Sequence, residues 1–289
     1  MVIVNLILAI IPGILIGWFI QHKDKNKESK GLLIKLFLGG VASCFLTLLI
    51  SGGVKLIIPN AIPGVGVKNT NIVILFFQVL CGIALIEEFC KWFFSYIIGY
   101  RHHEFDETFD AIVYCTFVSL GFAVFENVLY VFAMDDQLMT ALLRAFTAVP
   151  GHVCDAIVMG YFLGMAKRSA VNGYPGKTKY LILSILMPTI IHGLYDFLIL
   201  SGSIVLVCIW LIFIICVYIY AIKKVNKISK TGGTIVDYQV PVQGMNVMPT
   251  INQQVDMVPS SPVTNSPKIC EGCGSPVNTP FCMYCGKKQ

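Results

Sequence analysis

Seven apolar stretches, each long enough to cross a lipid bilayer, constrain this chain more than any other feature of its sequence. The composition agrees with them, because 56% of the residues are hydrophobic and only 13% are charged. The sequence therefore predicts an all-α polytopic membrane protein with about seven transmembrane helices. The approximate bounds of the stretches are 2–20, 33–58, 71–99, 109–134, 139–166, 180–199 and 203–222.

Basic residues gather in alternate loops between these stretches. Loop 21–32, loop 167–179 and the segment 223–230 are rich in lysine or arginine, and the loops between them are poor in both. Cytoplasmic loops carry such an excess, so we expect a multi-pass protein of the cell membrane with its N-terminus outside and its C-terminus in the cytoplasm. Stretch 2–20 lacks a basic segment before it and is expected to remain as an uncleaved helix. This charge pattern indicates membrane topology, and no nucleic-acid binding is expected.

Three regions follow one another along the chain. Residues 1–230 form the predicted helical membrane domain. Residues 231–268 are punctuated by Pro, Gly, Ser, Asn and Gln without a helical period, which is typical of a flexible cytosolic linker. Residues 269–289 contain two CxxC pairs, and a glycine follows each pair.

The paired CxxC motifs predict a small cytosolic zinc ribbon in which four cysteines coordinate the metal tetrahedrally, and a redox dithiol pair is the alternative. Four cysteines leave no open position on the metal, so the ribbon is expected to serve structure or the recognition of a protein partner. The predicted Zn²⁺ ligands are Cys270, Cys273, Cys282 and Cys285.

Three charges lie close together inside the third stretch, at Glu87, Glu88 and Lys91. A charge at the centre of a bilayer costs about 2.5–3.5 kcal/mol on insertion scales, which makes each a functional candidate. At about 100° per residue, Lys91 projects between the two glutamates and can neutralise either. The glutamates themselves point about 100° apart, so one of them is expected to do the chemistry, and the spacing leaves open which one.

Three other stretches contain ionisable residues at a similar depth. At 1.5 Å per residue, four side chains fall about 18–26 Å from the basic ends of their stretches: Glu88, Glu126, His152 and His192. His192 and Asp196 are spaced i,i+4, and His152 and Asp155 are spaced i,i+3, so each imidazole can share a helix face with a carboxylate.

These polar residues together suit the activation of water. Either one glutamate, or a divalent metal held by Glu126, His152 and His192, can take a proton from water in such a site. The imidazoles or the metal can then stabilise the oxyanion of a peptide carbonyl. Two other functions fit the same residues: a transporter or proton relay lined by the polar slab, and a sensor or scaffold that acts through the ribbon.

Four ordered motifs over about residues 75–200 resemble those of the PrsW family of intramembrane peptidases. They are "EEFCK" at 87–91 (EExxK), "GFAVFENVLY" at 121–130 (FxxxE, with Phe122 and Glu126), "RAFTAVPGHVCDAIVMGYFLG" at 144–164 (with His152) and "HGLYDF" at 192–197 (HxxxD, with His192 and Asp196). The family is related to the CAAX prenyl peptidases. Those enzymes have His in place of Glu126 and Arg near Lys91, which argues against a prenyl-protein substrate.

The resemblance implies hydrolysis of a peptide bond in a membrane-anchored protein, with site-1 cleavage of an anti-sigma factor as the best-known role. It implies that Glu87 or Glu88 activates water and that Glu126 and His192 complete the site. Whether such a site uses a metal or a glutamate with bare water stays open at this point. The zinc ribbon lies outside the resemblance.

Overall fold

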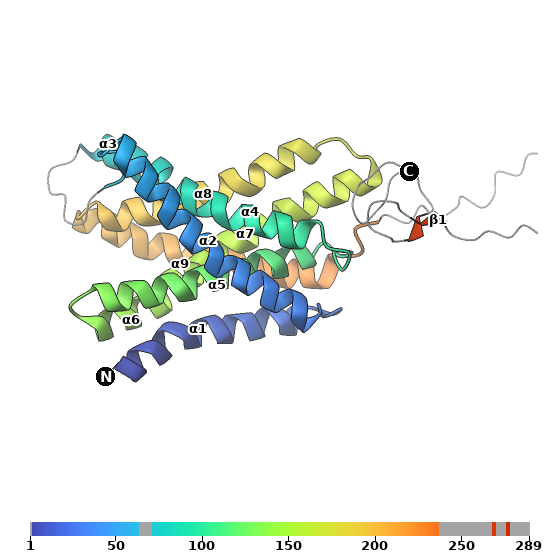
Figure 1. The fold of residues 1–289 in the computed structure, drawn as a ribbon, viewed down its shortest axis with the longest axis horizontal. Coiled ribbons are helices and arrows are strands. Elements are labelled where there is room, and N and C mark those ends of the chain that lie inside the picture. Colours follow the sequence, from blue (N-terminus) through green and yellow to red (C-terminus); the bar gives the residue numbers. More distant parts are fainter. Residues whose placement is uncertain (1, 64–70, 237–267, 270–275, 278–289) are drawn as a thin grey trace, which may run out of the picture.

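The structure, a computed structural model, describes residues 2–63, 71–236, 268–269 and 276–277. In these residues, long helices run back and forth along one axis (Figure 1). Seven segments are long and apolar enough to cross a membrane, which confirms the predicted number of spans. Five of them are single helices: α1 (Val2–Lys23), α2 (Lys30–Ile57), α5 (Asp110–Ala133), α8 (Lys177–Leu200) and α9 (Ile204–Thr231).

The third segment changes its helical geometry twice. It begins as α3 (Ile72–Val79), widens into the π-helical turn η1 (Leu80–Ala84), continues as α4 (Leu85–Phe94) and ends as the π-helical η2 (Ser95–Tyr100). Isolated π-helical turns inside α-helices occur frequently at functional sites. Here they flank the ten residues that carry both glutamates and the lysine.

The fifth segment is broken, whereas the sequence predicts one helix over 139–166. It consists of α6 (Gln137–Phe146) and α7 (Ala148–Asn172). Pro150 has no N–H to donate to the carbonyl of Phe146, so a continuous helix loses a bond there. The hydroxyl of Tyr218 donates instead to the carbonyls of Phe146 and Thr147, at 3.0 and 2.9 Å. A side chain of α9 thus satisfies the backbone at the break, as the interior of a membrane requires.

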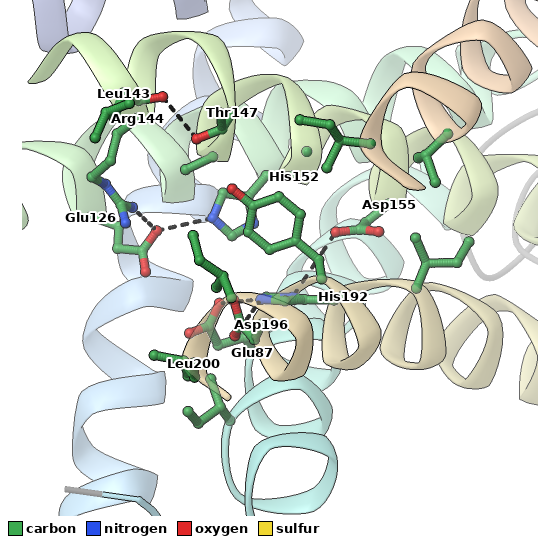
Figure 2. A pocket seen from close by; sticks show the side chains of 18 of the residues that line it. Glu87, Glu126, Leu143, Arg144, Thr147, His152, Asp155, His192, Asp196 and Leu200 are labelled. Atoms are coloured by element: carbon green, nitrogen blue, oxygen red, sulfur yellow. Dashed lines mark hydrogen bonds and ion pairs between the residues drawn. The ribbon is translucent and has the colours of Figure 1, made fainter. Parts of the chain in front are cut away.

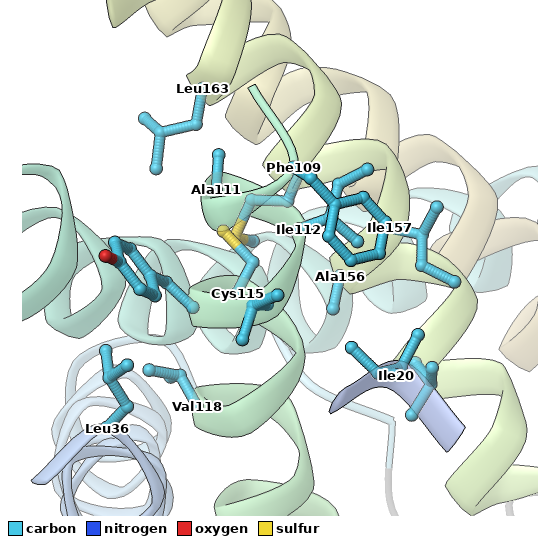
Figure 3. Close-up of a cluster of buried hydrophobic side chains, with 14 of the residues drawn as sticks. Ile20, Leu36, Phe109, Ala111, Ile112, Cys115, Val118, Ala156, Ile157 and Leu163 are labelled. Atoms are coloured by element: carbon cyan, nitrogen blue, oxygen red, sulfur yellow. The ribbon is translucent and has the colours of Figure 1, made fainter. Parts of the chain in front are cut away.

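Helices α2 and α5 approach each other closely at two glycines. A Cβ atom on Gly40 would lie 1.9 Å from the carbonyl oxygen of Val118, and one on Gly121 would lie 1.9 Å from that of Phe37. Small residues allow such backbone contact between membrane helices. Around α5, buried side chains of α1, α2 and α7 form the main hydrophobic core (Figure 3).

The predicted basic loops share one end of the bundle, where α1, η2 and α7 end and α9 leaves the helices (Figure 1). At this end the chain after α9 is held in place. Thr234 forms an antiparallel bridge with Glu107, and the N–H of Ile235 donates to the carbonyl of Asp106 at 2.7 Å. Residues 232–236 therefore pack on the membrane domain, although the sequence suggests a linker from residue 231.

Beyond residue 236 the structure describes only two short strands. The strands β1 (Lys268–Ile269) and β2 (Pro276–Val277) pair antiparallel. The predicted zinc ligands lie outside the described residues: Cys270, Cys273, Cys282 and Cys285.

Candidate active site

Lys91 of α4 lies at the centre of the polar residues inside the bundle. Its ammonium Nζ donates to Glu88 Oε1 at 2.7 Å and lies 3.6 Å from Glu87 Oε2. It also lies 4.1 Å from the centroid of the Phe122 ring, which gives the Phe of the FxxxE motif a cation–π contact. Only 1% of Lys91 is exposed. The lysine therefore supplies the positive charge that two adjacent buried carboxylates require.

The hydrogen bonds of His152 define its neutral tautomer. Lys91 Nζ lies 3.0 Å from His152 Nδ1, and an ammonium can only donate. Nδ1 is therefore the acceptor, and the ring proton sits on Nε2, 2.9 Å from Glu126 Oε2. His152 thus joins Lys91 of α4 to Glu126 of α5, and Figure 2 shows its contact with Glu126.

His192 of α8 faces carboxylates on both sides of its ring. Nδ1 lies 2.8 Å from Glu88 Oε1 and 4.0 Å from Asp155 Oδ2. Nε2 lies 3.4 Å from Asp196 Oδ2 and 3.8 Å from Glu87 Oε2. Whichever nitrogen carries a proton has an acceptor, so the ring orientation is held by its neighbours.

Arg144 of α6 is a site residue that the sequence reasoning missed. Its Nη2 donates to Glu126 Oε2 at 2.7 Å, and its Nε donates to Asn127 Oδ1 at 2.7 Å. The guanidinium also lies over the ring of Tyr130, 3.9 Å from the centroid. The sequence did contain a signal, because an arginine inside an apolar stretch is as exceptional as the glutamates are.

One network connects every site residue predicted in the membrane domain. We call these residues, together with Asp155 and Arg144, the core cluster. Its members come from α4, α5, α6, α7 and α8, and each touches at least one other member. The members are Glu87, Glu88, Lys91, Glu126, Arg144, His152, Asp155, His192 and Asp196.

A cavity of about 340 Å³ opens beside the core cluster. Glu87 lines it, whereas Glu88 does not and is 1% exposed. Glu87 Oε2 is buried and has no hydrogen-bond partner. The structure therefore separates the two glutamates. Glu88 is engaged with Lys91 and His192, whereas Glu87 is part of the cavity wall (Figure 2).

The cavity wall combines this polar surface with apolar side chains from α6, α8 and α9. Leu143, Leu200 and Phe213 are among them. An apolar cavity with a few converging polar groups is the usual form of a binding site. Here it lies between segments that are long enough to span a membrane.

Within the core cluster, two overlapping groups of side chains have ligand atoms close enough to hold a metal ion. Glu88, His152, Asp155 and His192 form one, with atoms within 4.8 Å of one another. Glu87, Glu126 and His152 form the other. Among the described residues, Glu126 and His192 fall in different groups, and His152 belongs to both. The nitrogen and oxygen donors suit zinc and similar ions, and the unpartnered Asp155 Oδ1 adds a free ligand atom, so the residues fit a metal.

Comparisons with known proteins agree with this site. Residues 28–222 match the family described as "PrsW family intramembrane metalloprotease". A "Protease PrsW" of Oceanobacillus iheyensis is 34% identical over 221 residues, which cover 76% of this chain and 94% of the relative. Those of Bacillus subtilis (33%, covering 68% and 82%) and Clostridioides difficile (32%, covering 76% and 87%) are similar.

No solved structure matches the chain. The family match covers more than half of its residues and includes every member of the core cluster. The chain belongs to the PrsW family of intramembrane metalloproteases, and it is a multi-pass membrane protease.

Proposed function

We propose that Glu87 is the general base that activates water for peptide hydrolysis in the cavity. The observation that carries this proposal is that Glu87 lines the cavity, whereas Glu88 does not and is engaged with Lys91 and His192. Glu87 takes a proton from water, and the oxygen of that water attacks the carbonyl carbon of the scissile bond. The same carboxyl group then returns the proton to the leaving amine nitrogen.

The remaining members of the core cluster orient the side chains around the cavity and neutralise buried charge. Glu88 holds His192 at 2.8 Å and Lys91 at 2.7 Å, which keeps both near the cavity wall. His192 lines the cavity, and a protonated ring nitrogen of this residue can donate to the oxyanion that forms during the attack. Asp196, 3.4 Å from His192 Nε2, orients that ring before substrate binds.

The divalent metal that the family implies fits best at Glu88, His152, Asp155 and His192. This group contains two imidazoles and two carboxylates, the donor set that catalytic zinc sites commonly use. When bound, the metal supplies a Lewis acid next to the carboxylate of Glu87. The sequence expectation of Glu126 together with both histidines is not favoured, because those three do not form one such group among the described residues.

The substrate we propose is a polypeptide anchored in the membrane, with an anti-sigma factor as the specific candidate. The cavity lies within the spanning segments and is walled partly by apolar side chains, so a peptide segment in the bilayer can reach Glu87 without entering bulk water. The anti-sigma factor itself rests on the family resemblance.

Cleavage in reconstituted membranes tests this function. Purified full-length chain and a single-span anti-sigma factor, tagged at both ends, are placed in liposomes, and fragments are followed by immunoblot. Wild type is expected to produce two fragments, and Glu87→Gln is expected to lose at least about 100-fold in rate. Equal cleavage by both proteins would remove Glu87 from the mechanism. Glu104→Gln, outside the cavity, is the matched control.

Metal content in the same preparations tests the core metal. The wild type is expected to contain one ion that His192→Ala loses and that a Cys282→Ser, Cys285→Ser double variant retains. The double variant is expected to lose one Zn²⁺, because the spacing of Cys270, Cys273, Cys282 and Cys285 supports a four-cysteine zinc ribbon that serves structure or partner recognition. An active wild type without metal would leave the glutamate and bare water as the mechanism.

The orientation we propose places the basic loops and the C-terminus in the cytoplasm. It is supported by the excess of lysine and arginine in the loops at one end of the bundle. A protease site added at the C-terminus is expected to be cut only after the cells are opened. Cutting by protease added to intact spheroplasts would show that the C-terminus lies outside and that the proposed orientation is wrong.

A further inference from the structure

A second acidic group lies at the end of the bundle that carries the basic loops. Asp24 directly follows α1, Glu107 lies in the loop before α5, and Asp110 is the first residue of α5. One carboxylate oxygen of each lies within 4.8 Å of the other two. From residue 110 to residue 126 the rise of α5 is about 24 Å, so this group is separate from the core cluster. We call these three residues the end cluster.

Two of its three side chains are buried with an oxygen that has no partner. Asp24 is 5% exposed and Asp110 is 1% exposed. Oδ1 of each is buried without a hydrogen-bond partner. A buried oxygen left unsatisfied costs about 1–3 kcal/mol, and more if it is charged. A cation coordinated by both oxygens would remove this cost.

The other oxygen of Asp110 is already held in place. Oδ2 accepts the N–H groups of Asp106 at 3.0 Å and Glu107 at 2.7 Å. These bonds fix the carboxylate plane, so Oδ1 has a defined direction before any ligand arrives. The amide of Asn26 likewise donates to one oxygen of Glu107 and restrains that side chain.

Carboxyl groups are concentrated around the end cluster. Glu28 lies close by and accepts a hydrogen bond from the Tyr114 hydroxyl at 2.8 Å. Ionised carboxylates gathered in a partly desolvated place repel one another, and a multivalent cation is the ligand that relieves such repulsion most.

We propose that Asp24, Glu107 and Asp110 bind one hard divalent cation, Mg²⁺ or Ca²⁺. Ligands that are all oxygen favour these ions over zinc, which prefers nitrogen and sulfur. The cation joins the end of α1 to the loop before α5 and to α5 itself. Glu107 also bridges Thr234, so the ion fixes the segment that follows α9 as well. The site is structural: it stabilises the end of the bundle that carries the basic loops and takes no part in proteolysis.

Metal binding to the full-length chain in nanodiscs tests the site. After treatment with a chelator, Mn²⁺ is titrated and the free ion is measured by electron paramagnetic resonance. The wild type is expected to bind one ion more than Asp24→Asn and one more than Glu107→Gln. Saturating Mg²⁺ or Ca²⁺ is expected to raise the unfolding midpoint of the wild type by at least about 2 °C, and to raise that of the variants by less than half as much.

Two controls separate this site from others. Asp135→Asn removes one exposed carboxylate and lies outside every group of possible metal ligands among the described residues, so it should bind as the wild type does. His192→Ala should lose only an ion of the core cluster and should keep the response of the midpoint to Mg²⁺.

Two results would overturn the proposal. One is equal Mn²⁺ stoichiometry and an equal Mg²⁺ response in wild type and Asp24→Asn. The other is an unfolding midpoint of the wild type that does not change with saturating Mg²⁺ or Ca²⁺.

Discussion

The core cluster and the end cluster both gather carboxylates, but they are compensated in different ways. In the core, Glu88 and Glu126 each lie 2.7 Å from a cationic side chain, Lys91 and Arg144. At the end, the hydrogen bonds that Glu107 and Asp110 accept come from neutral donors among the described residues: backbone N–H groups and the amide of Asn26. A site inside the bilayer must contain its own counter-charges, whereas a site at the surface can take a cation from solution.

The largest effect should follow from removing the counter-charge of the core. Lys91→Met leaves two adjacent buried carboxylates without their cation, and we expect a loss of about 3–5 kcal/mol in the free energy of unfolding. Cleavage should disappear with it. Unfolding in detergent with increasing denaturant measures the loss. The double variant Glu88→Gln, Lys91→Met should recover part of the stability, and a loss as large as that of Lys91→Met alone would show that the pair is not the cause.

Substitution of Arg144 should have an intermediate effect, because Arg144 pairs with Glu126 and does not contact Glu87 or Glu88. Arg144→Gln is expected to lower the cleavage rate about 10- to 100-fold through misplacement of Glu126 and His152. The comparison of kcat and KM for a tagged membrane substrate measures it, and the loss should appear mainly in kcat. Arg144→Lys should restore part of kcat, since it keeps the charge. An unchanged kcat in Arg144→Gln would make the arginine a packing residue only.

Removal of Mg²⁺ and Ca²⁺ by a chelator should have the smallest effect. We expect it to lower the unfolding midpoint through the loss of the ion bound at the end cluster. The removal of Mg²⁺ and Ca²⁺ is expected to lower the unfolding midpoint of the wild type by about 2–4 °C. Asp110→Asn should remove this sensitivity and change the metal-free stability by less than about 1 kcal/mol. If the unfolding midpoint of the wild type responds to neither ion, the end cluster does not take a cation from solution, and the proposed difference between the two clusters is wrong.

The sequence singles out most residues of the core cluster and none of the end cluster, because only the former are unusual for their surroundings. Glu87, Lys91 and His192 interrupt apolar stretches, where an ionisable side chain is exceptional. Asp24 and Glu107 lie in loops, where charges are ordinary, and only the fold shows that they are buried or close together.

Other features depend on tertiary packing and were not accessible from spacing. The choice between Glu87 and Glu88 depends on how α4 is rotated between its two π-helical turns. The break between α6 and α7 is stabilised by Tyr218, a residue 72 positions from Phe146, whose hydroxyl donates to the carbonyl of Phe146. The number of spans, in contrast, follows from length and hydropathy alone, and the structure agrees with it.

The central claim is that Glu87 carries out proteolysis in the membrane, and cleavage products in cells test it most directly. Cells lacking the protein are complemented with wild type or with Glu87→Gln at equal levels, and new N-termini of membrane proteins are identified by mass spectrometry. We predict at least one membrane-anchored protein that is cut only in cells with the wild type and accumulates intact with Glu87→Gln. Identical sets of N-termini in the two strains would contradict the account.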